Sequence, residues 1–279
     1  MKGLDVGSAA GRGVRAELPE GLEAAVRETA AEIAALLRRG ADGMGARIPG
    51  AQWSAGEAAA HLALANELMA DLAAGRERPY GDGTPQSLAG ANESALADFG
   101  QREAGPLAAM IEEQAEACVR ALGEGGAATT VVTPLGEMSG EALGSYLLTH
   151  MLGHGYDLAR ALGQRHMLTA GRVELTLPFM TAVMERVTDP ARTAGLTASY
   201  AVRLWRGGGF GVQVEAGAVR VDARVPARAD CTIFIEPVTF LLMALGRSGQ
   251  WGALARGRIL VRGRRPWLAP RFPGLFTAP

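Results

Sequence analysis

The chain has 279 residues, of which 48% are hydrophobic and 20% charged, and its formal net charge is −1. This length is enough for two domains with separate cores, and the near-neutral charge gives no electrostatic indication of nucleic acid or an anionic membrane as a partner. Its two cysteines, Cys118 and Cys231, lie far apart in sequence, which excludes a disulfide framework and favours a reducing, cytoplasmic compartment. The N-terminus has no apolar stretch as long as that of a signal peptide, and no apolar run in the chain approaches the length of a membrane span. Residues 1–17 have the composition of a flexible Gly/Ala tail.

Helical periodicity dominates the chain as far as about residue 163. Residues 22–40 have apolar side chains three and four apart and end in Arg-Arg-Gly, a pattern that predicts a helix with its C-terminus there. A second helix begins at Ser54, which has capping-box spacing to Glu57. Helical character returns over residues 87–122, with an interruption expected near Gly105-Pro106. Residues 129–140 are β-prone, and Ser139 can cap the helix that follows.

The remainder of the chain has a different pattern of apolar and polar residues. After a helix over about residues 170–186, apolar and polar residues alternate in four segments, as they do in strands: 198–207, 210–217, 218–225 and 230–236. Two short helices, a strand near residues 258–263 and a Pro-rich closing segment complete the pattern. We therefore predict an α plus α+β protein: a tail (1–17), an antiparallel four-helix bundle (18–168) and an α+β domain with a mostly antiparallel sheet (169–279).

Three of the four histidines point toward the interior of the predicted bundle. His150 and His154 are four residues apart on one helix, so they share a face, and their neighbours on that face are apolar. His61 lies in the apolar stripe of the helix that begins at Ser54, whereas His166 follows the motif helix and is expected to be exposed. Imidazole is a common ligand of zinc, nickel and iron, and three ligands leave a coordination position open. The alternative is that these are core histidines with hydrogen-bond partners.

Two segments resemble the DinB-like superfamily, specifically its mycothiol-dependent maleylpyruvate isomerase branch. They are "WSAGEAAAHLA", which ends near His61, and "HMLGHGYDLARALG", which contains His150 and His154. The segments "ADCTIFIEPVTFLLMALG" and "GALARGRILVRG" are similar to the sterol-carrier-like α+β domain that this branch carries at its C-terminus. The resemblance implies a DinB-like bundle whose metal ligands are His61, His150 and His154. The isomerase has a glutamate where this chain has His150, so the maleylpyruvate reaction itself is not implied.

The resemblance also implies the chemistry. It indicates an enzyme, either a mycothiol-dependent S-transferase or a cis–trans isomerase, which uses a divalent metal (zinc first, nickel or iron as alternatives) and mycothiol to attack an electrophilic small molecule. The isomerase uses an arginine from its C-terminal domain, and Arg203 and Arg206 are candidates by location. Asp157 either orients a ligand or substrate group, or has a structural role, as a surface pair with Arg160 or in packing at the helix end. No nucleic-acid or membrane partner is indicated. The sequence does not indicate an oligomeric state.

Two other functions stay open. The protein could be a non-catalytic small-molecule or lipid-binding protein, with the helical bundle as a scaffold. It could also be a metal enzyme that needs no thiol. Among the remaining features we expect Cys118 and Cys231 to be buried structural thiols, Trp53 to be a packing anchor and "RGGGFG" to be a hairpin turn. The basic segment "GRGRILVRGRRP" is expected to form a solvated sheet edge.

Overall fold

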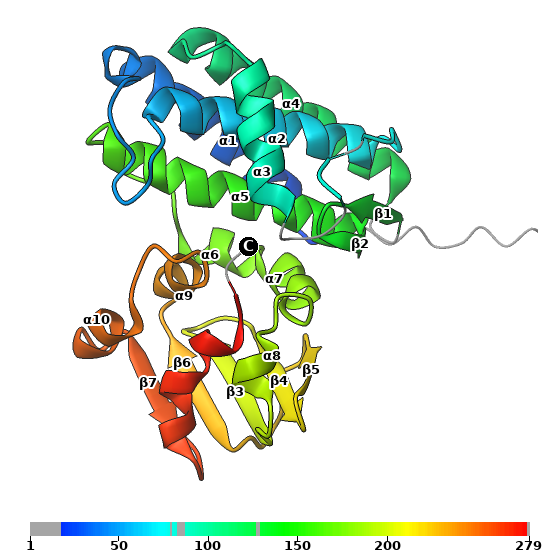
Figure 1. Cartoon of the computed structure of the whole chain (residues 1–279), viewed down its shortest axis with the longest axis vertical. Coiled ribbons are helices and arrows are strands. Elements are labelled where there is room, and N and C mark those ends of the chain that lie inside the picture. Colours follow the sequence, from blue (N-terminus) through cyan, green and yellow to red (C-terminus); the bar gives the residue numbers. More distant parts are fainter. Residues whose placement is uncertain (1–17, 79, 83–86, 127–128, 278–279) are drawn as a thin grey trace, which may run out of the picture.

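The computed structural model describes residues 18–277 except 79, 83–86 and 127–128, so the predicted tail over residues 1–17 lies outside the described residues. The first part is helical (Figure 1). Its elements are α1 (Leu22–Arg39), the 3-10 turn η1 (Ala41–Gly43), α2 (Ala55–Ala73), α3 (Leu88–Asp98), α4 (Ala104–Gly125) and α5 (Gly140–Ala161), with the hairpin β1 (Thr130–Thr133) and β2 (Gly136–Ser139) before α5. The long helices α1, α2, α4 and α5 pack against one another, and α1–α5 are called the helical half below.

Apolar spacing explains this packing. Helix α1 buries Val26, Ile33 and Leu37, and α5 buries Leu143 and Leu147, so each helix turns an apolar stripe toward the others. The predicted N-terminal caps are present on both helices that carry the clustered histidines, α2 with His61 and α5 with His150 and His154. Ser54 and Glu57 form a capping box at α2, and the Ser139 side chain accepts a hydrogen bond at the start of α5.

Two helix breaks differ from the sequence prediction, and proline explains both. The break in the 87–122 region falls at residues 99–103, before Pro106, which lies in the first turn of α4 where no intrahelical N–H is needed. The helix predicted over 170–186 is two helices, α6 (Ala170–Glu174) and α7 (Leu177–Met184). Pro178 stands at the start of α7, where it has no N–H to continue the preceding turn.

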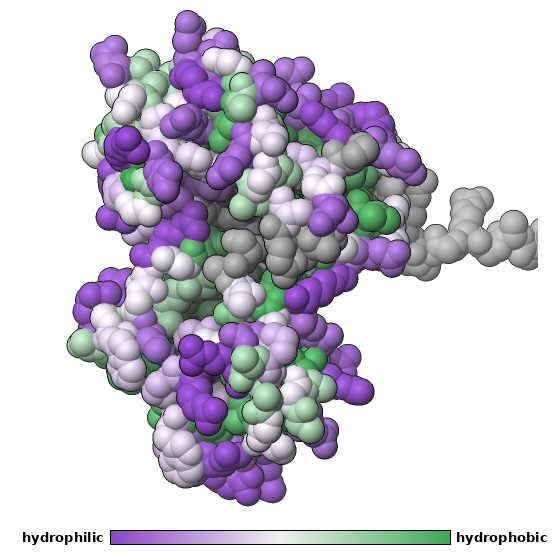
Figure 2. All heavy atoms as spheres, in the orientation of Figure 1, coloured by the Kyte–Doolittle hydropathy of each residue, from purple (hydrophilic) through white to green (hydrophobic). Residues whose placement is uncertain are grey.

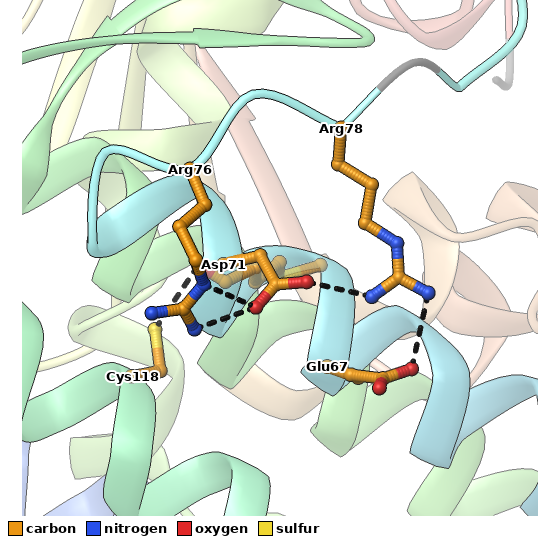
Figure 3. A network of polar contacts seen from close by, with 6 residues as sticks. Glu67, Asp71, Arg76, Arg78 and Cys118 are labelled. Carbon is orange, nitrogen blue, oxygen red and sulfur yellow. Dashed lines mark hydrogen bonds and ion pairs between the residues drawn. The ribbon is translucent and has the colours of Figure 1, made fainter.

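An ion-pair network closes the C-terminal end of α2 (Figure 3). Asp71 accepts hydrogen bonds from Arg76 and Arg78, and Arg78 also pairs with Glu67. The Cys118 thiol lies 3.7 Å from the Met69 carbonyl and is buried. Burial raises the pKa of Cys118 to about 12, so this cysteine is a protonated core residue, as predicted.

The second part is built on a five-stranded sheet and is called the sheet half below (Figure 1). Its order is β5-β4-β3-β6-β7, and only the β3–β6 pair is parallel among the described strands. The remaining elements of this half are α6, α7, α8 (Pro190–Thr193), β3 (Ala198–Leu204), β4 (Gly209–Glu215), β5 (Ala218–Asp222), β6 (Cys231–Ile235), α9 (Pro237–Ala244), α10 (Gln250–Ala255), β7 (Ile259–Arg262), η3 (Pro266–Arg271) and η4 (Pro273–Leu275). The predicted combination of helices with a mostly antiparallel sheet is thus confirmed.

Specific contacts join the two halves along α5 and the β1–β2 hairpin. Arg186, just after α7, donates hydrogen bonds to the carbonyls of Leu135 and Glu137 in the hairpin. Leu245 of the sheet half lies so close to Gly153 of α5 that a Cβ there would come within 3.0 Å of a Leu245 methyl. Figure 2 shows a recess between the halves in which apolar side chains are visible. No helix among the described residues is long and apolar enough to cross a bilayer.

Candidate metal centre

The structure brings His61, His150 and His154 together between α2 and α5. Their potential ligand nitrogens all lie within 4.8 Å of one another. The Nε2 atoms of His61 and His150 are 3.1 Å apart, and the three pairs of ring centroids are separated by 4.5 to 5.0 Å. These three side chains could hold a metal ion. His166, as predicted, is exposed and stays apart, with its ring against Tyr156 at 5.4 Å.

Burial keeps all three imidazoles neutral at pH 7. His61 is 5% exposed, and its burial lowers its pKa to about 4. The pKa values of His150 and His154 are lowered well below their ordinary value, first by burial. His61 and Arg247 lower the pKa of His150 further, and His150, His61 and Arg247 lower that of His154. Neutral imidazole is the form that coordinates metal, so the cluster is poised for binding without first releasing protons.

Two observations are compatible with a metal ion at this cluster. Two Nε2 atoms facing each other at 3.1 Å cannot both be protonated, and an ion between them would use both lone pairs. Two imidazole nitrogens on a tetrahedral zinc at about 2.0–2.1 Å are about 3.3 Å apart, close to the observed separation. The Nδ1 atom of His150 is also buried without a hydrogen-bond partner among the described residues. A hydrogen bond in which one Nε2 is protonated fits the same distance, so the feature that favours a metal is the convergence of three neutral imidazoles.

The buried imidazoles make the metal-free protein sensitive to acid. Because the pKa of His61 is about 4 when folded and about 6.5 when unfolded, the unfolded chain binds a proton first as the pH falls. Stability is therefore complete above pH 6.5 and is lost toward pH 4, by about 3 kcal/mol from His61 alone. Urea unfolding at pH 7.0, 5.5 and 4.5 with a chelator present measures this. A flat profile would contradict it, and His166→Gln should leave the wild-type profile unchanged because His166 is exposed.

Aromatic side chains enclose the cluster. Trp53, at the entrance to α2, has its ring 4.9 Å from that of His61 and 6.4 Å from that of His154. Tyr146, one turn before His150 on α5, meets the His150 ring edge-on at 6.2 Å. Burial raises the pKa of Tyr146 to about 12, so the phenol is protonated at neutral pH. Trp53 is therefore a packing anchor, as predicted, and it packs on the candidate ligands themselves.

Asp157 and Arg247 form an ion pair between the halves beside this cluster. Asp157 is buried, and its Oδ2 is 2.7 Å from Nη2 of Arg247, which follows α9. The same carboxylate lies 3.9 Å from Nδ1 of His154, beyond hydrogen-bond range in this geometry. The proposed surface pair with Arg160 is wrong, because Asp157 faces the sheet half, while Arg160 lies over the Tyr156 ring.

The arginine near the histidines is Arg247 rather than Arg203 or Arg206. Arg203 lies on β3 and Arg206 in the β3–β4 turn, and no described contact joins either to the cluster. Sequence reasoning missed Arg247 because its position depends on how α9 docks on α5. The only local signal was its place at the end of "TFLLMALGR", directly after an apolar helix. Cys231 is buried in β6, and burial raises its pKa to about 11, which fits the predicted structural thiol.

Comparison with known proteins gives a likeness of structure. No family model and no curated protein sequence matches the chain. A solved structure of a histidine-to-alanine mutant of the mycothiol-dependent maleylpyruvate isomerase matches with a TM-score of 0.50 and 15% identity, covering 82% of this chain and 89% of that chain. The two chains share a fold. A further structure of the same isomerase gives a TM-score of 0.46 at 15% identity, covering 83% and 90%.

A second kind of match is partial. The stereoselective inverting sec-alkylsulfatase Pisa1 from Pseudomonas sp. matches over 49% of this chain with a TM-score of 0.31 and 14% identity. The chain spans about a quarter of that sulfatase, 24% of its length. With identities this low, the likeness to the mycothiol-dependent isomerase is one of fold, and the activity has to be argued from the site.

Proposed function

We propose that this protein is a metal-dependent, thiol-using S-transferase or cis–trans isomerase. The observation that carries the proposal is the largely buried, neutral cluster of His61, His150 and His154, with Arg247 held beside it. The fold neighbour is, by its name, mycothiol-dependent and an isomerase, so mycothiol is the first thiol to test. We further propose that residues 18–168 form a DinB-like four-helix bundle and residues 169–279 a sterol-carrier-like domain.

The three imidazoles would hold the metal, and zinc fits a neutral nitrogen set best, with nickel or iron as alternatives. When bound, the metal would act as a Lewis acid that lowers the pKa of a coordinated thiol. The chain's own residues do the rest. Trp53 and the docked sheet half restrict the access of water to the cluster. The Asp157 carboxylate fixes the Arg247 guanidinium by accepting hydrogen bonds from Nε and Nη2 of the arginine.

Arg247 then selects and activates the acceptor. Its guanidinium can pair with a substrate carboxylate or with the oxygen that becomes negative when a thiolate adds to a conjugated alkene. In that addition a C–S bond forms and the alkene electrons move onto the carbonyl as an enolate. Rotation about the new single bond and expulsion of the thiolate give the isomer. If a proton from solvent quenches the enolate instead, the product is the S-conjugate.

The test is activity that needs both components. Elemental mass spectrometry of the purified protein should find about one divalent metal per chain, and chelation should remove it. We expect consumption of an unsaturated carbonyl acid only when zinc and mycothiol are both present, with glutathione a poor substitute. Turnover without any thiol would favour the thiol-independent metal enzyme. Failure to take up any metal would favour the non-catalytic small-molecule or lipid-binding alternative.

A further inference from the structure

The sheet half contains an apolar cavity of about 510 Å³ that the proposed reaction does not use. Strands β3, β6 and β7 line it on one side, and α7, α9, α10 and the C-terminal turns on the other. None of the lining residues is charged, and only Gln250 and Thr277 bear an amide or hydroxyl group. Close packing does not leave voids of this size, and the volume falls in the range of about 300–1,000 Å³ typical of small-molecule sites. The cavity therefore has the properties of a site for an apolar group.

Side-chain contacts connect the lining of the cavity to the helix that carries His150 and His154. Phe179 of α7 lines the cavity and stacks on Tyr146 at 4.3 Å, and Tyr146 in turn contacts His150. Leu245, which also lines the cavity, lies directly on Gly153, between the two histidines of α5. Phe179 and Tyr146 thus stand between the cavity and His150, and Leu245 stands between the cavity and the α5 backbone.

Arg247 stands at this boundary. Gly246 is a lining residue, and the next residue is Arg247, whose guanidinium reaches Asp157. A guanidinium has five N–H groups. Those of Arg247 bond to Asp157 through Nε and Nη2 and to the Leu245 carbonyl through Nη1. One N–H on each terminal nitrogen has no further partner among the described residues, and the side chain is 30% exposed. These groups can receive a carboxylate.

This part of the chain is rich in arginine. Residues 237–279 contain seven arginines and no aspartate or glutamate. Four of these arginines pair with carboxylates elsewhere in the chain, Arg247 with Asp157, Arg258 with Glu236, and Arg264 and Arg265 with Asp230. At the other end of the cavity, the lining residues Trp251 and Trp267 are each 64% exposed, so the cavity reaches the surface at α10 and η3. A ligand that enters at this surface therefore meets apolar side chains in the cavity, and Arg247 directly follows the lining residue Gly246.

We propose that the substrate is an anionic amphiphile, whose carboxylate pairs with Arg247 and whose alkyl chain or apolar ring occupies this cavity. The proposal rests on the function proposed above and names its substrate class. The electrophilic carbon next to the carboxylate would then lie on the histidine side of Arg247, and the apolar part on the side of Phe179 and Leu245. A small polar keto acid would leave the cavity empty and would bind weakly.

Binding can be tested without catalysis. Dodecanoate and dodecanol should each displace the fluorescent probe 1-anilinonaphthalene-8-sulfonate from the chelated full-length protein, with dodecanoate at least about tenfold tighter because of the charged pair. Arg247→Gln should remove the preference for the acid and keep the binding of the alcohol. Two cavity-filling variants, Val183→Phe and Ala244→Trp, should weaken both ligands, whereas Val132→Phe on the exposed face of β1 is the matched control. Thermal melts establish that each variant is folded.

Catalysis then tests the substrate assignment separately. With zinc and mycothiol present, 4-oxo-2-alkenoates of increasing chain length should show KM falling about fourfold per added methylene until the cavity is filled. No displacement of the probe, or a preference for the acid that survives in Arg247→Gln, overturns the proposal. So does a KM independent of chain length. Tight, Arg247-dependent dodecanoate binding without any thiol-dependent turnover would instead overturn the proposed function and leave the ligand class standing.

Discussion

Replacing any one of His61, His150 and His154 with alanine should abolish stoichiometric metal binding. Each imidazole supplies one of the three nitrogens of the cluster, so two ligands would remain. Loss of a partner that merely orients a ligand costs about 10–100-fold in metal affinity, and loss of a ligand itself should exceed that. Elemental mass spectrometry after dialysis measures the metal per chain, and zinc titration with a chelating indicator gives the affinity. Thiol-dependent turnover should disappear with the metal.

His166→Ala is the matched control, because this histidine is exposed and lies outside the cluster. It should retain full metal content and activity. His150→Glu is a second control, because a carboxylate is also a zinc ligand and the variant should keep the metal while its turnover changes. Equal metal content in all three alanine variants and in His166→Ala would refute a site built from these residues.

Arg247→Ala should lower kcat/KM by about 10²–10³ while leaving the metal content unchanged. The expectation follows from removing a donor aimed at charge that develops during addition, which typically has this effect. Arg247 belongs to the sheet half and supplies no metal ligand, so metal binding and turnover should separate in this variant. Steady-state kinetics with an unsaturated keto acid, at saturating thiol, measures the loss. An effect confined to metal content would contradict the assignment.

Asp157 and two other arginines sharpen this test. Asp157→Asn removes the negative charge that fixes the guanidinium, so kcat should fall by about tenfold, less than in Arg247→Ala. Arg247→Lys should recover part of the activity, because it keeps the charge and loses the two-pronged pairing. Arg203→Ala and Arg206→Ala should stay within about twofold of wild type, since no described contact joins them to the histidines.

Local pattern predicted the features that depend on one element at a time. The i, i+4 spacing placed His150 and His154 on one face, the apolar stripe of α2 placed His61 toward it, and Ser54 and Ser139 marked the helix starts. Sequence pattern was less reliable at proline, which can interrupt a helix or lie in its first turn. Pro106 lies in the first turn of α4, and Pro178 lies at the start of α7.

Features that depend on docking between elements were beyond the sequence. Arg247 reaches Asp157 only because Leu245 lies on Gly153, and a glycine inside a helix gives no sign of which segment will approach it. The apolar cavity has the same origin. Its lining comes from β-strands, helices and the C-terminal turns, and each of these segments on its own has the composition of an ordinary core.

All three imidazoles come from α2 and α5, whereas the guanidinium beside them comes from the segment after α9. Activation of a thiol and choice of an acceptor would therefore be encoded in separate stretches of the chain. Substitutions between residues 237 and 279 can change what is accepted without disturbing the ligand set. Under the proposed function, changes in the second half would alter the acceptor while α2 and α5 keep the metal ligands.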